Sequence, residues 1–361
     1  YPFERLAALF SGVTPPAGLA PIALHIGEPR HAAPAIVLEA LARHREGYSK
    51  YPKTAGEPWL REAMAAWLAR RYALPTGQPC PETQVLPVNG SREALFSFTQ
   101  AAVSREGSAR VRVAMPNPFY QIYEGAALLA GAEPLFLPER KDRPGIPDLA
   151  AVPEEDWRHC QMLVLCSPGN PSGAVMQQED WREVFALADR HGFIVASDEC
   201  YSELYPDESA PPIGVLGACH ALGRAGFAGC IAFHSLSKRS SLPGLRSGMV
   251  SGDAALLKQY LLYRTYHGSA MPLPHQHASA AAWGDETHVR ENRALYRAKF
   301  DAVLAELDGA LDVRAPEGGF YLWAKVPGED ATFARELYRA TGVSVLPGSF
   351  LARPMPQGNP G

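Results

Sequence analysis

Lys238 has the clearest potential for covalent chemistry, because it closes the stretch Ser235-Leu236-Ser237-Lys238 and Arg246 follows eight residues later. An exposed lysine has a pKa of about 10.4 and is a poor nucleophile. Burial and a neighbouring cation such as Arg246 lower that pKa and permit Schiff-base chemistry. Two hydroxyls and a guanidinium also suit a phosphate group. A solvated basic turn is the alternative explanation of the same residues.

The turn Gly90-Ser91-Arg92 follows an apolar run at residues 84–88 and opens a helical segment. Free backbone N–H groups at a helix N-terminus bind anions, and phosphate is the commonest of them. Simple capping of the helix by Asn89 or Ser91 is the alternative. The turn is therefore a second candidate for a phosphate site.

Asp198 ends another apolar run, and Tyr201 follows three residues later. Burying a carboxylate is costly without a cationic or N–H partner, and the neighbouring sequence supplies none, which indicates a ligand. Asn170 lies in the turn-rich loop 167–173, and Tyr120 follows two prolines. They could present an amide and an aromatic ring to the same ligand. A local turn hydrogen bond and core packing are the alternatives for these two residues.

Four other interpretations of short motifs fail. The S-x-x-K pattern at 235–238 also occurs in penicillin-recognising enzymes, but the S-D-N and K-T-G companions are missing. The glycine motifs of dinucleotide and nucleoside-triphosphate folds are absent as well. His275 and His277 have no further ligands at metal-binding spacing, so we expect no metal site.

Short apolar runs alternate with amphipathic segments through the middle of the chain. The runs are residues 84–88, 110–115, 134–137, 162–166, 193–197, 230–234 and 249–251, and the helical segments include 92–103, 120–130 and 179–191. This alternation predicts an α/β fold with a mostly parallel sheet that is buried on both faces. Chemistry in such sheets gathers at the carboxyl ends of strands, where the polar residues described above should meet.

The segments before and after this alternating part have different hydrophobic patterns. Helical patterns at 34–45 and 57–72 come before the alternating part, and a long charged helix at 286–307 follows it. A strand-like segment at 320–325, a helix at 331–341 and a short strand at 343–346 complete the chain. We expect an N-terminal arm (1–33) that joins the small domain, a large α/β domain (34–270) and a small α+β domain (271–361).

The composition is that of an ordinary globular protein, with 361 residues, 20% charged and 47% hydrophobic, and a formal charge of −4. This charge gives no sign of a nucleic-acid or membrane partner. The six cysteines form no C-x-x-C pair and are predicted to be reduced. Neither a signal peptide nor a membrane-spanning run is evident, so we expect a cytoplasmic location.

Taken together and in order, these positions resemble the class I and II aminotransferases, which are pyridoxal-phosphate (PLP) enzymes of fold type I. The resemblance extends from about Leu24 to the last residue. Its motifs are Gly27-Glu28-Pro29, Lys50-Tyr51, Gly90-Ser91, the aromatic residue near 120, Asn170-Pro171, Asp198 to Tyr201, Ser235 to Lys238 and Gly244-Leu245-Arg246. It implies a mostly parallel seven-stranded sheet between helices, a smaller α+β domain, and PLP as the cofactor.

The resemblance also implies roles for individual residues. Lys238 would hold the cofactor as a Schiff base and then move a proton between the substrate Cα and the cofactor. Asp198 would keep the pyridine nitrogen protonated. Tyr201 and Asn170 would bind the phenolic oxygen of the ring, and Tyr120 would stack on the ring face.

The phosphate of the cofactor would be bound from several directions. The implied ligands are Ser235, Ser237, Arg246, Gly90, Ser91 and Arg92, together with Tyr51 from the neighbouring subunit of a homodimer. An arginine that grips the substrate α-carboxylate in this family follows an Asn-Pro-Gly-like turn. This chain stops at such a turn, so we expect it to be truncated there. The backbone of Gly27 and the side chain of Asn170 are then the candidates for binding the substrate carboxylate.

Within the family, several stretches are most similar to bacterial N-succinyldiaminopimelate aminotransferases of the lysine pathway. The stretches are residues 51–56, 117–125, 235–240, 263–268 and 349–353 with 359–361. This implies amino transfer between glutamate and N-succinyl-2-amino-6-oxoheptanedioate, with Arg30, His31 or Lys53 lining the cleft mouth. Another amino-acid aminotransferase or a PLP β-lyase remains an alternative. A non-enzymatic effector-binding module is disfavoured because no basic helix-turn-helix segment is present.

Overall fold

The computed structural model describes residues 1–104, 110–356 and 358–361. Its main feature is a seven-stranded sheet in the order β2-β8-β7-β6-β5-β3-β4, in which β8 runs antiparallel to its two neighbours and the other pairs are parallel. The strands are β2 (Val85–Val88), β3 (Arg112–Pro116), β4 (Glu133–Leu137), β5 (Cys160–Cys166), β6 (Ile194–Asp198), β7 (Cys230–Ser235) and β8 (Gly248–Gly252). The predicted α/β fold with a mostly parallel sheet is confirmed.

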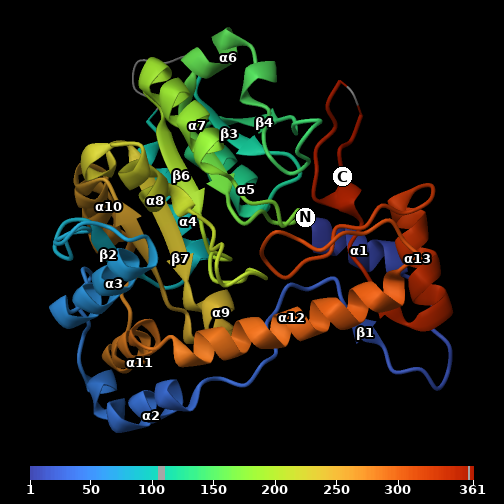
Figure 1. The fold of residues 1–361 in the computed structure, drawn as a ribbon, viewed down its shortest axis with the longest axis horizontal. Helices are drawn as coiled ribbons and strands as arrows, with labels where there is room; N and C mark the ends of the chain where they lie inside the picture. Colours follow the sequence, from blue (N-terminus) through green and yellow to red (C-terminus); the bar gives the residue numbers. More distant parts are fainter. Residues whose placement is uncertain (105–109, 357) are drawn as a thin grey trace.

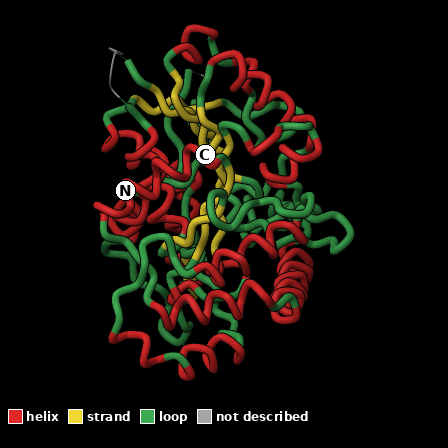
Figure 2. The backbone as a smooth tube through the Cα atoms, turned by 90° about the vertical axis from the view of Figure 1, so that its left-hand side faces the viewer, coloured by secondary structure: helices red, strands yellow, loops and turns green. Residues whose placement is uncertain are grey.

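Helices cover both faces of this sheet, and the strands form a twisted column between them (Figure 2). The helices are α1 (Pro2–Phe10), α2 (Ala35–Arg43), α3 (Pro58–Arg71), α4 (Ser91–Ala102), α5 (Ile122–Ala130), α6 (Glu154–Arg158), α7 (Gln178–His191), α8 (Gly214–Ala221), α9 (Leu236–Arg239), α10 (Ala254–His267), α11 (Leu273–Gly284), α12 (Thr287–Leu307) and α13 (Asp330–Thr341). Two apolar clusters fill the space between sheet and helices, one around Trp67 and Trp283, the other around Phe98 and Tyr260. Double-sided burial explains why the strands read as continuous apolar runs.

The N-terminal segment lies beside the C-terminal part of the chain. Strand β1 (Ile22–Ala23) pairs in parallel with β9 (Val343–Ser344), and Phe10 of α1 stacks on Tyr338 of α13 with 4.4 Å between the ring centroids. Helix α12 runs from the region of α11 toward α13 along one side of the molecule (Figure 1). The proximity of the two ends agrees with an arm that joins the small domain. The domain boundaries themselves remain predictions.

The expected strand at 320–325 is wrong. Lys325 makes an isolated bridge to Asp312, and the segment belongs to no sheet in the described part of the chain. Just before it, Gly318 N–H donates to the Gly173 carbonyl at 2.9 Å, and Gly319 N–H donates to the Leu204 carbonyl at 2.7 Å. The backbone is therefore tied to loops of the large sheet instead of to a partner strand.

Among the described residues, no helix combines the length and the apolar character needed to cross a membrane.

Candidate active site

Three loops with predicted site residues leave the same edge of the sheet. Asp198 ends β6, Ser235 ends β7, and Asn170 lies in the loop that follows β5. The strand register aligns these ends, since Cys166 pairs with Asp198 and Asp198 pairs with Phe233. The parallel order therefore gathers these chain segments at one edge, as the sequence predicted.

The Asp198 carboxyl group is buried, with 2% of the residue exposed. Its Oδ2 accepts a hydrogen bond from the Tyr123 hydroxyl at 2.8 Å, and its Oδ1 accepts one from the Cys200 N–H at 3.3 Å. Burial raises the pKa of Asp198, while these two donors act in the opposite direction. Sequence reasoning found no partner for this carboxyl and missed Tyr123, which comes from α5.

Lys238 belongs to the short helix α9, directly after β7. Its Nζ donates a hydrogen bond to the Gly27 carbonyl at 2.5 Å and lies 5.0 Å from the centre of the Phe320 ring. Burial is the main cause that lowers the pKa of Lys238. Cys200 and Glu28 oppose this shift, and Arg92 and Arg246 add to it. A desolvated amine beside two cations is a better nucleophile than a surface lysine, as the sequence predicted.

A cradle for an anion forms where α4 begins. Gly90 precedes the helix with φ of 94° and provides no side-chain cap, so capping by Asn89 or Ser91 is not observed. A Cβ atom on Gly90 would collide with Nη2 of Arg246, a guanidinium that also donates to the Asn89 carbonyl at 3.3 Å. The glycine therefore lets a guanidinium approach a helix N-terminus, an arrangement that suits a phosphate.

Ser235 at the end of β7 and Ser237 in α9 extend the polar lining on the far side of β8, which lies between β2 and β7. Ser235 Oγ accepts the Ser237 N–H at 3.1 Å, which caps α9, and donates to Ser237 Oγ at 3.0 Å. The two hydroxyls thus lie together, one turn or less before Lys238.

Tyr120 and Arg92 are joined directly, because Arg92 Nε donates to the Tyr120 hydroxyl at 2.5 Å. The Tyr120 ring also meets Tyr123 edge to face, with 5.7 Å between centroids. Burial raises the pKa of Tyr120, and Arg92 opposes this shift. The guanidinium of Arg92 thus fixes the ring that was expected to stack on the cofactor.

Tyr201 contacts a residue that the sequence did not identify. Its hydroxyl forms a hydrogen bond of 2.7 Å with the hydroxyl of Tyr321, and its ring meets Phe320 edge to face. Phe320 and Tyr321 both lie in the segment expected to be a strand, which is why their side chains were not considered for the site. An adjacent aromatic pair after two glycines was the available signal.

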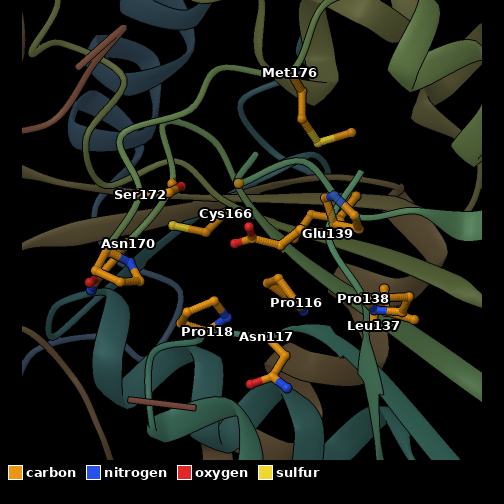
Figure 3. Close-up of a pocket in the computed structure, with 15 residues that line it drawn as sticks. Pro116, Asn117, Pro118, Leu137, Pro138, Glu139, Cys166, Asn170, Ser172 and Met176 are labelled. Atoms are coloured by element: carbon orange, nitrogen blue, oxygen red, sulfur yellow. The ribbon is translucent and has the colours of Figure 1, made fainter. Parts of the chain in front are cut away.

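Asn170 is half-buried and borders a small hollow next to Cys166 and Ser172 (Figure 3). Prolines 116 and 118 and the end of β4 form its other walls, and Glu139 extends into it. Neither Lys238 nor Asp198 lines this hollow. The hollow therefore lies beside the Asn170 loop and is separate from the residues around Lys238.

The structure keeps some predicted residues apart from this group. Tyr51 is fully exposed, with a relative accessibility of 103%, and Arg30 is exposed too. Lys53 pairs with Glu57 at 2.9 Å, and His31 Nδ1 lies 2.7 Å from the side-chain oxygen of Asn292. Asn292 also donates to the Lys238 carbonyl at 3.1 Å, so His31 is linked to the lysine segment, whereas Tyr51, Arg30 and Lys53 make none of the contacts described around Lys238.

The fold and the residues at its strand ends fit a PLP-dependent enzyme. The buried Asp198 carboxyl can meet a protonated ring nitrogen, and the Gly90 and Arg246 cradle can hold a phosphate. The pattern of the family described as "Aminotransferase class I and II" matches residues 20–356, so the chain belongs to this family, and PLP is its cofactor.

Individual relatives agree with this assignment. The chain is 50% identical to an aminotransferase of Neisseria meningitidis, with a TM-score of 0.95 over 100% of this chain and 90% of that one. It is 26% identical to a structure from Thermus thermophilus described as a probable N-succinyldiaminopimelate aminotransferase, with a TM-score of 0.86 over 99% and 93% of the two chains. It is 31% identical to an LL-diaminopimelate aminotransferase of Nitratidesulfovibrio vulgaris, covering 92% of this chain and 84% of that protein.

Proposed function

We propose that this aminotransferase exchanges an amino group between glutamate and N-succinyl-2-amino-6-oxoheptanedioate, a step in the synthesis of diaminopimelate and lysine. The observation that carries the transamination chemistry is the desolvated Lys238 amine, which lies one strand away from the buried Asp198 carboxyl. The substrate assignment is supported by the sequence stretches described above and by the relatives named for diaminopimelate substrates.

PLP supplies an aldehyde that condenses with amino groups and a ring that withdraws electrons from the substrate Cα. Lys238 would hold it through Nζ and would accept and return the proton at the substrate Cα. Asp198 would keep a proton on the ring nitrogen, because a buried carboxylate is stabilised by a cation at hydrogen-bond distance. The Tyr123 hydroxyl orients this carboxyl through its hydrogen bond of 2.8 Å.

The remaining residues bind and orient. Tyr201 and Asn170 would hold the phenolic oxygen, and Tyr120, fixed by Arg92, would cover the ring face. The Gly90-Ser91-Arg92 turn would hold the phosphate together with Ser235, Ser237 and Arg246. Gly27 offers its backbone to the substrate carboxylate, together with the Asn170 amide. Tyr51 reaches the phosphate in the second subunit of a homodimer.

Another amino-acid aminotransferase is the main alternative. Of the candidates at the cleft mouth, which are Arg30, His31 and Lys53, two already have partners within the chain. Lys53 pairs with Glu57, and His31 forms a hydrogen bond with Asn292. A PLP β-lyase is the second alternative, because the same electron sink serves several reactions.

Two measurements test the proposal. The PLP-loaded enzyme given glutamate alone should release stoichiometric 2-oxoglutarate, and borohydride reduction should attach PLP to Lys238. A panel of amino acceptors should then rank N-succinyl-2-amino-6-oxoheptanedioate highest in kcat/KM.

The K238A variant is the control for both measurements, since it lacks the amine. Absence of 2-oxoglutarate would overturn the transaminase assignment in favour of a lyase. Turnover of aromatic or aliphatic keto acids without the succinylated acceptor would overturn the substrate assignment alone.

A further inference from the structure

Tyr321 connects three chain segments at the candidate active site. Its hydroxyl lies 2.7 Å from the Tyr201 hydroxyl, although the two residues are 120 positions apart in the sequence. The rings meet at 65° with 5.6 Å between their centroids. The Gly319 N–H, two residues before Tyr321, donates to the Leu204 carbonyl in the Tyr201 loop. A backbone bond and a side-chain bond therefore join the same two segments.

The third segment is the one that accepts the hydrogen bond of Lys238. A Cβ atom on Gly27 would collide with the Tyr321 hydroxyl and would lie 2.9 Å from two ring carbons of Tyr321. Gly27 accepts from Lys238 Nζ, and the residue before Tyr321, Phe320, covers the same amine at 5.0 Å. Tyr321 thus packs against the Gly27 backbone, whose carbonyl accepts the hydrogen bond from Lys238, and its hydroxyl is hydrogen-bonded to Tyr201.

The hydrogen bond of the pair has two possible directions, since either hydroxyl can be the donor. Each phenol has one proton to donate and can accept at its oxygen. If Tyr321 donates to Tyr201, the proton of Tyr201 is free for a third acceptor. If Tyr201 donates to Tyr321, its proton is used within the pair. A donor that is itself hydrogen-bonded at its oxygen also becomes a stronger donor.

Resting on the proposed function, we propose that Tyr321 is a positioning residue whose hydroxyl donates to Tyr201 Oη and so directs the Tyr201 proton to the phenolic oxygen of the cofactor. Tyr321 acts through Tyr201 and needs no contact with the reacting atoms.

The electrostatic surroundings keep both phenols protonated. Burial raises the pKa of Tyr201 and of Tyr321. The hydrogen bond with Tyr201 lowers the pKa of Tyr321, whereas burial, Cys200, Cys166 and Tyr120 raise it, and the rise prevails. A neutral pair leaves each proton available to donate.

The variant Tyr321→Phe tests this role, because it removes one hydroxyl and leaves the ring in place. PLP bound to Lys238 absorbs visible light, and its spectrum titrates with pH. A hydrogen bond to the phenolic oxygen stabilises the deprotonated chromophore, so weakening the bond should raise its pKa. The expected rise is about 0.5 to 1, the equivalent of one ordinary hydrogen bond. PLP affinity measured by titration of the apoenzyme should fall by about two- to tenfold.

Two further variants separate a positioning role from a packing role. Tyr296→Phe removes a hydroxyl from the ring that stacks on Phe320, with 5.6 Å between centroids, and should leave the spectral pKa unchanged. Tyr201→Phe should raise that pKa on its own, and adding Tyr321→Phe should then have little further effect. Such non-additivity is expected only if Tyr321 acts through Tyr201.

The outcomes distinguish this inference from the proposed function. A wild-type enzyme in which PLP is not attached to Lys238 would overturn both. Attached PLP with an unshifted spectral pKa in Tyr321→Phe, or additive shifts in the double variant, would overturn the role of Tyr321 alone. A shift in Tyr296→Phe equal to that in Tyr321→Phe would also overturn it, because general packing would then explain both.

Discussion

At the scale of single residues, the chemistry depends on how the chain changes two ordinary side chains. Phe320 and the Gly27 segment shield the Lys238 amine from solvent, and this burial lowers its pKa. The guanidinium groups of Arg92 and Arg246 lower the pKa further. Asp198 is desolvated as well, but burial raises its pKa because its charged form is negative. Burial therefore favours the neutral form of both groups. The Lys238 amine becomes a nucleophile, and the Asp198 carboxylate requires a cationic ligand to stay charged.

Gly27 gives the residue-scale prediction. Gly27→Ala places a methyl group on the Tyr321 side chain, so either the ring or the carbonyl that accepts from Lys238 must move. We expect kcat/KM to fall by about 5- to 150-fold, the equivalent of an overpacking cost of about 1–3 kcal/mol. Steady-state kinetics and the spectrum of bound PLP measure the change.

Gly125→Ala is the matched control for this glycine. A Cβ atom at Gly125, within α5, would meet nothing within 4 Å, so activity should stay at the wild-type value. Wild-type kcat/KM in Gly27→Ala would show that the Tyr321 contact is not a constraint.

The site residues that the sequence predicted and those that it did not differ in how far along the chain their partners lie. Asp198 and Ser235 were predicted to lie at one sheet edge because a strand end is a local pattern. Tyr123 and Tyr321 reach their partners across 75 and 120 positions, and no local spacing encodes such contacts. The chemistry-bearing strand ends were therefore predictable, whereas the residues that orient them needed the structure.

At the scale of elements, the seven apolar runs each became a strand, because burial on both faces leaves an unmistakable pattern. The segment 320–325 is apolar too, but it does not form a strand. Its Phe320 and Tyr321 rings cover Lys238 and Tyr201, so their apolar nature serves the site instead of a sheet. β-propensity reports on packing, and in this segment the packing partner is the active site.

A buried chain of charges joins elements on either side of the Tyr201 loop. Glu203 Oε1 lies 2.6 Å from Arg71 Nε of α3, and Glu203 Oε2 lies 3.4 Å from Arg293 Nη1 of α12. The exposed fractions of the three side chains are 10% or less. Burial would raise the pKa of Glu203, but Arg71, Arg239 and Arg293 outweigh it and lower the value below the usual 4.5.

Glu203→Gln should destabilise the fold, because it leaves the buried Arg71 guanidinium without its counter-ion, whereas Arg293 keeps Glu208 at 2.7 Å. We expect a loss of about 3–5 kcal/mol in unfolding free energy above pH 5. A carboxyl with a lowered native pKa stabilises the fold above its unfolded value of 4.5, and this stabilisation is lost as the pH falls through the native pKa. The difference between wild type and variant should therefore shrink in acid, as measured by urea unfolding across pH.

Glu179→Gln, in the exposed pair with Arg182, is the control and should leave unfolding unchanged. If Glu203→Gln matched this control at neutral pH, the buried chain would not be a stabilising link.

At the scale of the whole molecule, one chain does not bring Tyr51 to the residues that it is proposed to assist. Tyr51 is fully exposed, and Tyr48 beside it is 59% exposed. Leu262 and Tyr266 on α10 are also exposed, at 62% and 86%. Exposed large apolar side chains are expected where another subunit binds. The proposed homodimer, in which Tyr51 crosses to the second site, would account for these exposures.

Mixed dimers test whether Tyr51 acts across the interface. A Lys238→Ala subunit keeps Tyr51, and a Tyr51→Ala subunit keeps Lys238. If Tyr51 serves the partner's site, a heterodimer of these subunits contains one site with both residues intact and one with neither. Doubly tagged heterodimers should then bind PLP at one of two sites with wild-type affinity, whereas Tyr51→Ala homodimers bind it only weakly. If Tyr51 acted within its own subunit, no intact site would form, and the heterodimer would show only weak binding.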